Sequence, residues 1–237
     1  MTIEVSVILA LVLGGLFYAS KSVSPSGAIA GGLLTFVYGL AWSPFPFVAF
    51  AAFVVIGTLS SRIGRHQKRS LGVYQNEKGP RDWSHAIANC GVGALIVCGG
   101  RLFPEQFSPS LAALLASASL SAVCADTCAS EWGTWLGGEP RNILNFRPAK
   151  IGSDGAVTWR GTLAGLLGAA LIAGSVAPFV SEPGRVAVCL IAAGAIGNIA
   201  DSIFGATVEP HLGRHGGSYV NAACSIVGAA SMAILIA

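Results

Sequence analysis

Eight apolar segments joined by polar stretches make up most of this 237-residue chain and limit what it can fold into. Charged residues are 11% of the sequence, against about 25% in soluble domains, and the mean hydropathy is +0.68. A membrane helix needs about 20 apolar residues, or slightly fewer if it is short. The sequence therefore predicts an all-α, polytopic bundle of about eight transmembrane helices, forming one integral-membrane domain over residues 1–237. The segments lie near residues 4–20, 27–41, 46–60, 84–100, 110–130, 160–179, 185–205 and 218–236.

The basic residues predict how this bundle is oriented. With eight spans, 12 of the 14 Lys and Arg residues fall on one face, and only Arg101 and Arg185 fall on the other. Because cytoplasmic loops carry the excess of Lys and Arg, we expect the crowded face to be cytoplasmic and both termini to lie outside. The two long loops, roughly 61–83 and 131–159, are then cytoplasmic loops of a protein of the cytoplasmic (inner) membrane. The 12 residues are Lys21, Arg62, Arg65, Lys68, Arg69, Lys78, Arg81, Arg141, Arg147, Lys150, Arg160 and Arg214.

The acidic residues gather on the same face, which topology alone does not explain. Eight of the 11 Asp and Glu residues map there, and some of them sit at the ends of apolar segments. A carboxylate near hydrocarbon is costly unless something pairs with it, so such residues usually serve a function. We expect them to hold a cation and, through it, a phosphate. The eight are Glu77, Asp82, Asp126, Glu131, Glu139, Asp154, Asp201 and Glu209.

Other features exclude some classes of function. The net charge of +3 is small and gives no reason to expect nucleic acid as a partner. The six cysteines lie in apolar stretches without zinc-like spacing, which indicates small buried side chains. The basic run at 62–69 is expected to mark topology or to touch anionic membrane lipids.

The first motif is N-E-K-G-P-R-D-W, residues 76–83, just before the fourth segment. It offers two cations and two carboxylates, and Lys and Arg are natural binders of phosphate oxygens. If the helix begins at Arg81, then Arg81, His85 and Asn89 share one helix face. The alternative is a solvated basic loop, anchored at the interface by Trp83.

The second motif is centred on Asp126, whose helical neighbour at i+4 is Ser130. Glu131 is about 140° away from Asp126 around a helix, so the two can share an ion only if the helix ends between them. Carboxylates are the ligands that hard cations such as Mg²⁺ prefer. The alternative is a pair of interfacial carboxylates that water solvates.

The third motif places Asn198 and Asp201 on one face of the seventh segment, at i, i+3. The sequence A-D-S at 200–202 repeats A-D-T at 125–127, and both segments run from outside to inside. A duplicated two-helix unit would place Asp126 and Asp201 at similar depth, although three residues can also match by chance.

The fourth motif is the small-residue loop at 152–158, which contains Asp154 and Gly155. A loop of this kind can bring backbone N–H groups close to phosphate, while a plain turn and helix cap is the alternative. In the segment that follows, Gly161, Gly165 and Gly168 indicate close helix packing.

Together these motifs resemble one widespread integral-membrane family. The resemblance rests on N-E-K-G-P-R-D at 76–82, A-D-T-x-A-S-E at 125–131, S-D-G-A-V-T at 153–158 and G-N-I-A-D-S at 197–202. The family includes the plant chloroplast phytyl-phosphate kinase and human transmembrane protein 19, and it is similar to CTP-using lipid kinases and phosphatidate cytidylyltransferases. The resemblance covers nearly the whole chain. Cys128 is a departure, because a bulkier residue is expected there.

The resemblance implies CTP or a related nucleotide, a divalent cation such as Mg²⁺, and an isoprenoid monophosphate as acceptor. The resulting prediction is a prenyl-phosphate kinase. The metal ligands are Asp126 and Asp201, with Glu131 as a weaker candidate. The predicted catalytic residues are Lys78, Arg81, Asp82 and His85. The predicted substrate- and nucleotide-binding residues are Asn76, Glu77, Gly79, Asn89, Ser130, Asp154, Gly155, Asn198 and Ser202.

Three alternatives stay open at this point. The same residues suit cytidylyl transfer to a lipid phosphate. A transporter of a cation or phosphorylated metabolite also keeps carboxylates in helices, usually near mid-membrane. A membrane scaffold leaves the acidic residues without a purpose. The sequence leaves the oligomeric state open, a homodimer included.

Overall fold

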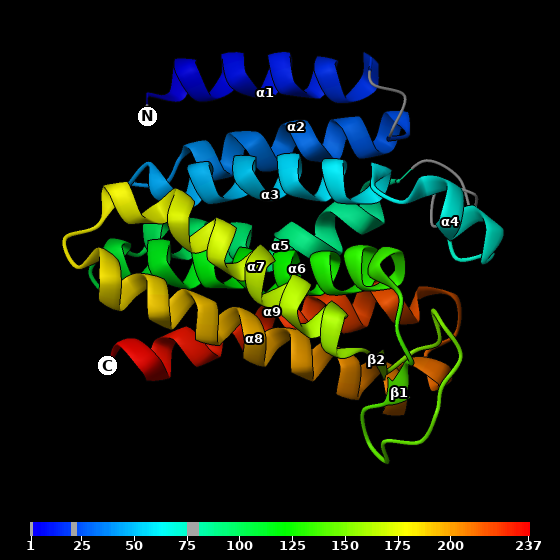
Figure 1. Cartoon of the computed structure of the whole chain (residues 1–237). Helices are drawn as coiled ribbons and strands as arrows, with labels where there is room; N and C mark the ends of the chain where they lie inside the picture. Colours follow the sequence, from blue (N-terminus) through cyan, green and yellow to red (C-terminus); the bar gives the residue numbers. More distant parts are fainter. Residues whose placement is uncertain (1, 20–22, 75–80) are drawn as a thin grey trace.

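All eight apolar segments form helices in the computed structural model, which describes residues 2–19, 23–74 and 81–237. A six-residue helix, a two-stranded hairpin and short 3₁₀ turns connect them (Figure 1). The main helices are α1 (Ile3–Ala19), α2 (Pro25–Gly39), α3 (Phe45–Arg62), α5 (Trp83–Leu102), α6 (Pro109–Leu136), α7 (Trp159–Val176), α8 (Pro183–Thr207) and α9 (Gly216–Ile236). The connecting elements are α4 (Arg65–Ser70), β1 (Arg141–Asn142), β2 (Ala156–Val157), η2 (Ala177–Phe179), η3 (Glu209–His211) and η4 (Gly213–His215).

The helix lengths refine the expected number of membrane spans. Six described helices, α3 and α5 to α9, are long and apolar enough to cross a membrane. Helix α1 is apolar but has 17 residues, and α2 has 15. Fifteen residues extend about 22 Å, less than the roughly 30 Å of a hydrocarbon core. Helix α2 is short because Ser24 caps its start at Pro25 and the W-S-P-F turn follows its end.

The main helices run alternately in opposite directions, so the connections gather at two ends of the bundle (Figure 1). One end holds α4, the β1–β2 hairpin and η3–η4, and is called the loop end below. Both chain termini lie at the opposite end. The described parts of the two segments predicted as long charged loops are therefore at the same end. The assignment of that end to the cytoplasm stays a prediction.

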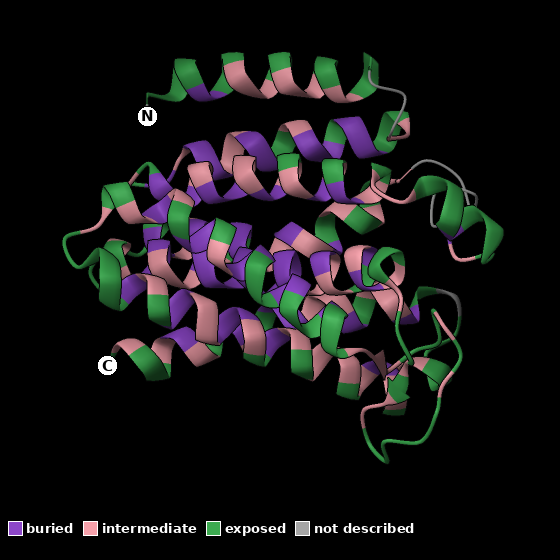
Figure 2. Ribbon diagram, in the orientation of Figure 1, coloured by how far each residue is buried: buried purple, intermediate pink, exposed green. Residues whose placement is uncertain are grey.

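Helix α6 is the centre of the bundle. Its apolar window is 78% buried, whereas the other five long helices are 33–39% buried, and the buried residues concentrate in the middle of the structure (Figure 2). Helices α7 and α9 pack closely against α6 at glycine positions, where the absence of a side chain lets the backbones approach. A Cβ at Gly168 of α7 would lie 2.9 Å from the Cys124 carbonyl oxygen, and one at Gly228 of α9 would lie 3.0 Å from that of Ala118. Small residues permit such contact where lipid gives helices no hydrophobic reason to associate, which confirms the predicted packing role of the α7 glycines.

Candidate active site at the loop end

Two aspartates from different helices meet inside the bundle. Helices α6 and α8 run in the same direction (Figure 1), and the carboxyl groups of Asp126 and Asp201 lie within hydrogen-bonding reach of each other. The predicted similar depth of the two residues is therefore confirmed. One oxygen, Oδ1 of Asp201, is buried and has no hydrogen-bond partner among the described residues. A buried acceptor without a partner is costly, and this one is suited to a cation.

Both aspartates lie farther from their helix ends than the sequence predicts. Helix α6 continues to Leu136, six residues beyond the predicted end at 130, and α8 continues to Thr207. Because α6 does not end between Asp126 and Glu131, the break that would let these two residues share an ion is absent. Glu131 accordingly has different partners.

A buried ion pair joins α4 to α6. Lys68 Nζ lies 2.5 Å from Glu131 Oε2 and donates a second hydrogen bond to the Ser60 carbonyl oxygen at 3.1 Å. Arg81 Nη2 lies 3.8 Å from the other carboxylate oxygen of Glu131. The side chains of Lys68 and Glu131 are 2% and 7% exposed. Buried charges persist when they are paired and hydrogen-bonded, so Glu131 is neutralised here by two cations.

The β1–β2 hairpin brings a third acidic residue to the aspartate pair. Its strands are antiparallel, with Arg141 opposite Val157 and Asn142 opposite Ala156. Gly155 has a φ of +70°, and a Cβ there would lie 2.9 Å from the Ala206 backbone nitrogen. This close approach places Asp154 beside the last turns of α8, where it acts electrostatically on Asp201.

Glu209, which follows α8, acts on Asp201 in the same way. In the part of the chain that the structure describes, however, no three His, Cys, Asp or Glu side chains are arranged to hold a metal ion by themselves.

The first motif is only partly described, because Asn76, Glu77, Lys78 and Gly79 lie outside the described residues. Helix α5 begins at Trp83 with Asp82 as its N-cap, so Arg81 precedes the helix and does not continue the face of His85 and Asn89, contrary to the prediction. The Arg81 backbone pairs instead with the segment before α2, where its carbonyl oxygen accepts a hydrogen bond from Ser24 N.

Asp82 acts as a helix cap in this structure. Its Oδ1 accepts hydrogen bonds from the Ser84 hydroxyl at 2.7 Å and the Ser84 backbone N–H at 3.0 Å, and it lies 3.0 Å from Nδ1 of His85. These hydrogen bonds from Ser84 and His85 hold the pKa of Asp82 below its ordinary value. A catalytic role for Asp82 and His85 stays a prediction.

Two of the predicted amide ligands lie at contacts between helices. Asn221 Nδ2 donates to Asn89 Oδ1 at 2.8 Å, linking α9 to α5. Asn198 points towards α7, since a Cβ at Gly165 would lie 2.8 Å from its Nδ2.

The two serines bond back to their own helices. Ser202 Oγ donates to the Asn198 carbonyl oxygen and Ser130 Oγ to that of Thr127, each at 3.2 Å. A hydroxyl that keeps such a bond still has acceptor capacity, so their predicted role in binding nucleotide stays open.

Lys68 is the main residue that sequence reasoning missed. It is one of four basic residues at 62–69, and no local pattern distinguishes it from the others. Its partner, Glu131, is 63 residues away, so only the tertiary structure reveals the pair.

The sequence matches the DUF92 family of integral membrane proteins over residues 8–234, and the chain belongs to this family. It is 30% identical over 225 residues to MJ0933, an uncharacterized membrane protein of Methanocaldococcus jannaschii, covering 94% of this chain and 90% of that protein. It is 31% identical over 196 residues to the chloroplastic protein VTE6 of Arabidopsis thaliana, covering 81% of this chain and 58% of that protein. It is 29% identical over 213 residues to the Arabidopsis protein PGR, covering 81% and 74%. No solved structure matches the chain significantly.

Proposed function

We propose that this protein transfers a phosphoryl group from CTP, or a related nucleotide, to an isoprenoid monophosphate in the membrane. A phosphate oxygen of the lipid attacks the γ-phosphorus, the bond from that phosphorus to the β-phosphate oxygen breaks, and the products are a prenyl diphosphate and CDP. The observation that carries the proposal is the Asp126–Asp201 pair, in which one buried oxygen has no hydrogen-bond partner among the residues that the structure describes. Membership of DUF92 and the resemblance to the phytyl-phosphate kinase family support it.

The aspartate pair fits a magnesium ion. Mg²⁺ is usually bound by one or two carboxylates together with water and substrate phosphates, so a cage of three or more protein ligands is not required. We assign Asp126 and Asp201 to the cation, because their carboxyl groups adjoin and no described residue donates a hydrogen bond to Asp201 Oδ1. When bound, Mg²⁺ would neutralise charge on the transferring phosphoryl group.

The other residues of the proposed site bind the substrates and orient their phosphate groups. Phosphoryl transfer depends mainly on alignment and charge neutralisation, and a lipid monophosphate is already anionic near pH 7, so no general base is needed. Arg81, whose side chain is 29% exposed, is available to phosphate oxygens. One carboxylate oxygen of Glu131 lies 3.8 Å from Arg81, and the other forms the ion pair with Lys68. We place the nucleotide with Arg81 on the cytoplasmic side, and Lys78, which lies outside the described residues, keeps its predicted role.

The deciding experiment uses detergent-purified protein with Mg²⁺, labelled CTP, and phytyl or geranylgeranyl monophosphate. Chromatography separates the products. Prenyl diphosphate together with CDP is the expected result. Pyrophosphate and a CDP-lipid would instead identify cytidylyl transfer by the same acceptor. Folded protein that turns over none of the common nucleotides would overturn the proposal and favour transport.

A further inference from the structure

An apolar groove runs along the outside of the loop end, between the last turns of α6 and the first turns of α7. Its volume is about 310 Å³, at the lower end of the usual size of a ligand pocket. The α7 residues follow the spacing of one helix face, and several of the leucines are exposed. The groove is therefore open towards the surrounding lipid. Its lining is Trp132, Leu136, Trp159, Arg160, Leu163, Ala164 and Leu167.

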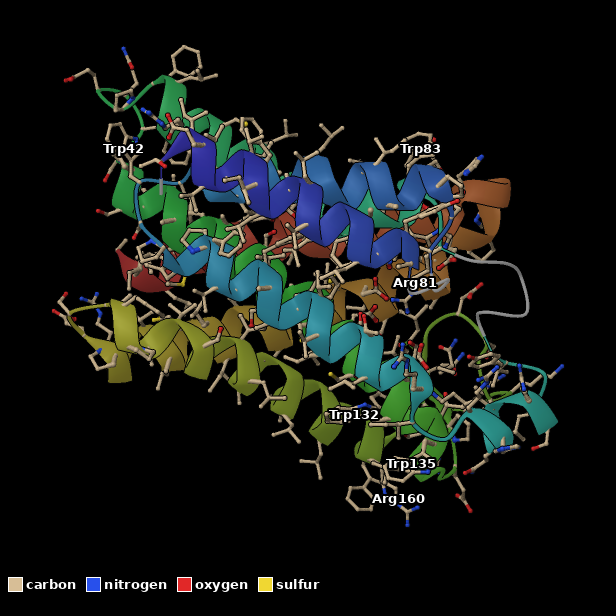
Figure 3. All side chains as sticks on the ribbon, turned by 90° about the horizontal axis from the view of Figure 1, so that it is seen from above. Trp42, Arg81, Trp83, Trp132, Trp135 and Arg160 are labelled. Atoms are coloured by element: carbon tan, nitrogen blue, oxygen red, sulfur yellow. The ribbon has the colours of Figure 1, made fainter. Side chains whose placement is uncertain are left out.

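The polar groups of this groove are donors. Arg160 is exposed, its Nη1 donates to the Leu136 carbonyl oxygen at 2.5 Å, and its guanidinium lies 5.4 Å from the Trp159 ring centroid. The indole Nε1 of Trp132 is buried and has no hydrogen-bond partner among the described residues. Figure 3 shows Trp132, Trp135 and Arg160 grouped together at the loop end. Among the described residues, no carboxylate lines the groove.

This combination fits a lipid with an anionic head. An apolar trough takes a hydrocarbon chain, and a guanidinium at its rim is the side chain best matched to phosphate oxygens. Trp132 also follows Glu131 directly, and Glu131 pairs with Lys68 and Arg81. The lining of the groove therefore begins one residue along α6 from this ion pair, with the two side chains about 100° apart around the helix.

We propose that this groove is the docking site through which the isoprenoid monophosphate acceptor enters from the membrane, with its chain along α7 and its phosphate at Arg160. The proposal rests on the proposed function, because it names the route of that acceptor. Arg160 donates to the carbonyl oxygen of Leu136, which is ten residues beyond Asp126 on α6, a rise of about 15 Å. The docked phosphate is therefore at the same end of the bundle as the aspartate pair but not on it, and the groove determines acceptor affinity rather than the chemical step.

Kinetics of matched variants test this role. Leu167→Trp fills the groove and Arg160→Gln removes its charge. Leu166→Trp, at the next position of α7, and Arg147→Gln, in the hairpin, are controls outside the lining. For geranylgeranyl monophosphate, we expect the two groove variants to raise KM about tenfold, the loss of roughly one good contact, with kcat and the KM for CTP unchanged. Unchanged KM in both groove variants, or equal effects in the controls, would overturn the proposal.

Photo-crosslinking separates this proposal from the proposed function. A diazirine-bearing geranylgeranyl monophosphate should label peptides of α6 and α7 around the groove, and unlabelled phytyl monophosphate should compete. Labelling of the groove without turnover would support the docking site and reject the kinase activity. Turnover without labelling of the groove would support the kinase activity and reject the docking site. Equal labelling by a phosphatidylglycerol probe would identify an ordinary lipid site, and protection by a second copy of the chain would identify a dimer interface. Either result would overturn the docking proposal.

Discussion

Helix α6 carries two acidic sites that differ in how their charges are satisfied. Glu131 is neutralised by Lys68 at 2.5 Å and approached by Arg81 at 3.8 Å. Asp126, five residues earlier, faces another acid, Asp201, one of whose oxygens is buried without a hydrogen-bond partner in the described part of the chain. A satisfied buried charge contributes to structure, whereas an unsatisfied one costs stability and is expected to serve a ligand. We therefore assign a structural role to Glu131 and a ligand-binding role to the pair of Asp126 and Asp201.

The largest expected effect is at the aspartate pair. Asp126→Asn or Asp201→Asn should reduce kcat by at least about 100-fold, since removing a group that stabilises transferring charge typically costs that much. Thermal stability in detergent should stay the same or rise, because the substitution relieves repulsion between two acids. The measurement is the labelled-CTP assay alongside a melting curve. Full activity in either purified variant would remove the metal assignment.

Breaking the ion pair should produce the opposite pattern. Lys68→Met leaves the buried Glu131 with the more distant Arg81 as its only cationic partner among the described residues, and removing one partner of a buried pair costs about 3–5 kcal/mol. Unfolding in increasing SDS measures this loss. The double variant Lys68→Met, Glu131→Gln should recover part of the lost stability. If Lys68→Met were as stable as the parent but inactive, Lys68 would belong to the chemistry and the comparison would fail.

Arg81 sharpens the boundary between the two sites. It is partly exposed and 3.8 Å from Glu131, so Arg81→Gln should cost at most about 1 kcal/mol of stability, as exposed ion pairs do. If Arg81 binds phosphate, the same variant should raise the KM for nucleotide or acceptor roughly tenfold or more. Steady-state kinetics and SDS unfolding of one preparation separate these effects. A loss of stability without a change in KM would place Arg81 with the ion pair alone.

The smallest effect is expected at Asp82, an acid that is hydrogen-bonded but only partly buried. Asp82→Ala removes the N-cap of α5 and should cost about 1 kcal/mol at pH 7. Because hydrogen bonds lower the pKa of the folded Asp82 carboxyl, its contribution is present above the ordinary value of 3.8 and is lost as pH falls below it. Melting curves of parent and variant should therefore converge at acidic pH. A difference that grows on acidification would contradict this account.

The helices could be predicted because apolar runs and proline residues are local features of the sequence. Each apolar segment predicts one helix, and the Pro residues of W-S-P-F-P-F predict a turn to within a few residues. The end of α6 was misplaced because Glu131 and Gly133 interrupt the apolar run, while the structure buries both residues and continues the helix through them. Local composition does not show that a distant lysine will neutralise an internal glutamate.

The candidate site was predictable in part. Asp126 and Asp201 were found because an acid inside an apolar segment is conspicuous and its A-D-S/T context is repeated. Lys68 was not found, since its burial depends on a partner 63 residues away. Arg81 was placed on the wrong face because an Asp N-cap at position 82 starts α5 two residues later than assumed. The Lys68 miss concerns a contact between distant segments, which periodicity does not encode, whereas the Arg81 miss concerns a local helix cap.

The glycine contacts around α6 have a consequence for how this protein can change over generations. A Cβ at Gly228 would lie 2.6 Å from the Ala122 Cβ, and a Cβ at Gly197 would approach the same atom even more closely. A larger residue at any of these three positions meets a neighbour that has no room to yield. The order of substitutions therefore matters: Ala122 has to be replaced by glycine before a larger residue is accepted at Gly197 or Gly228. If the larger residue comes first, the intermediate protein is destabilised.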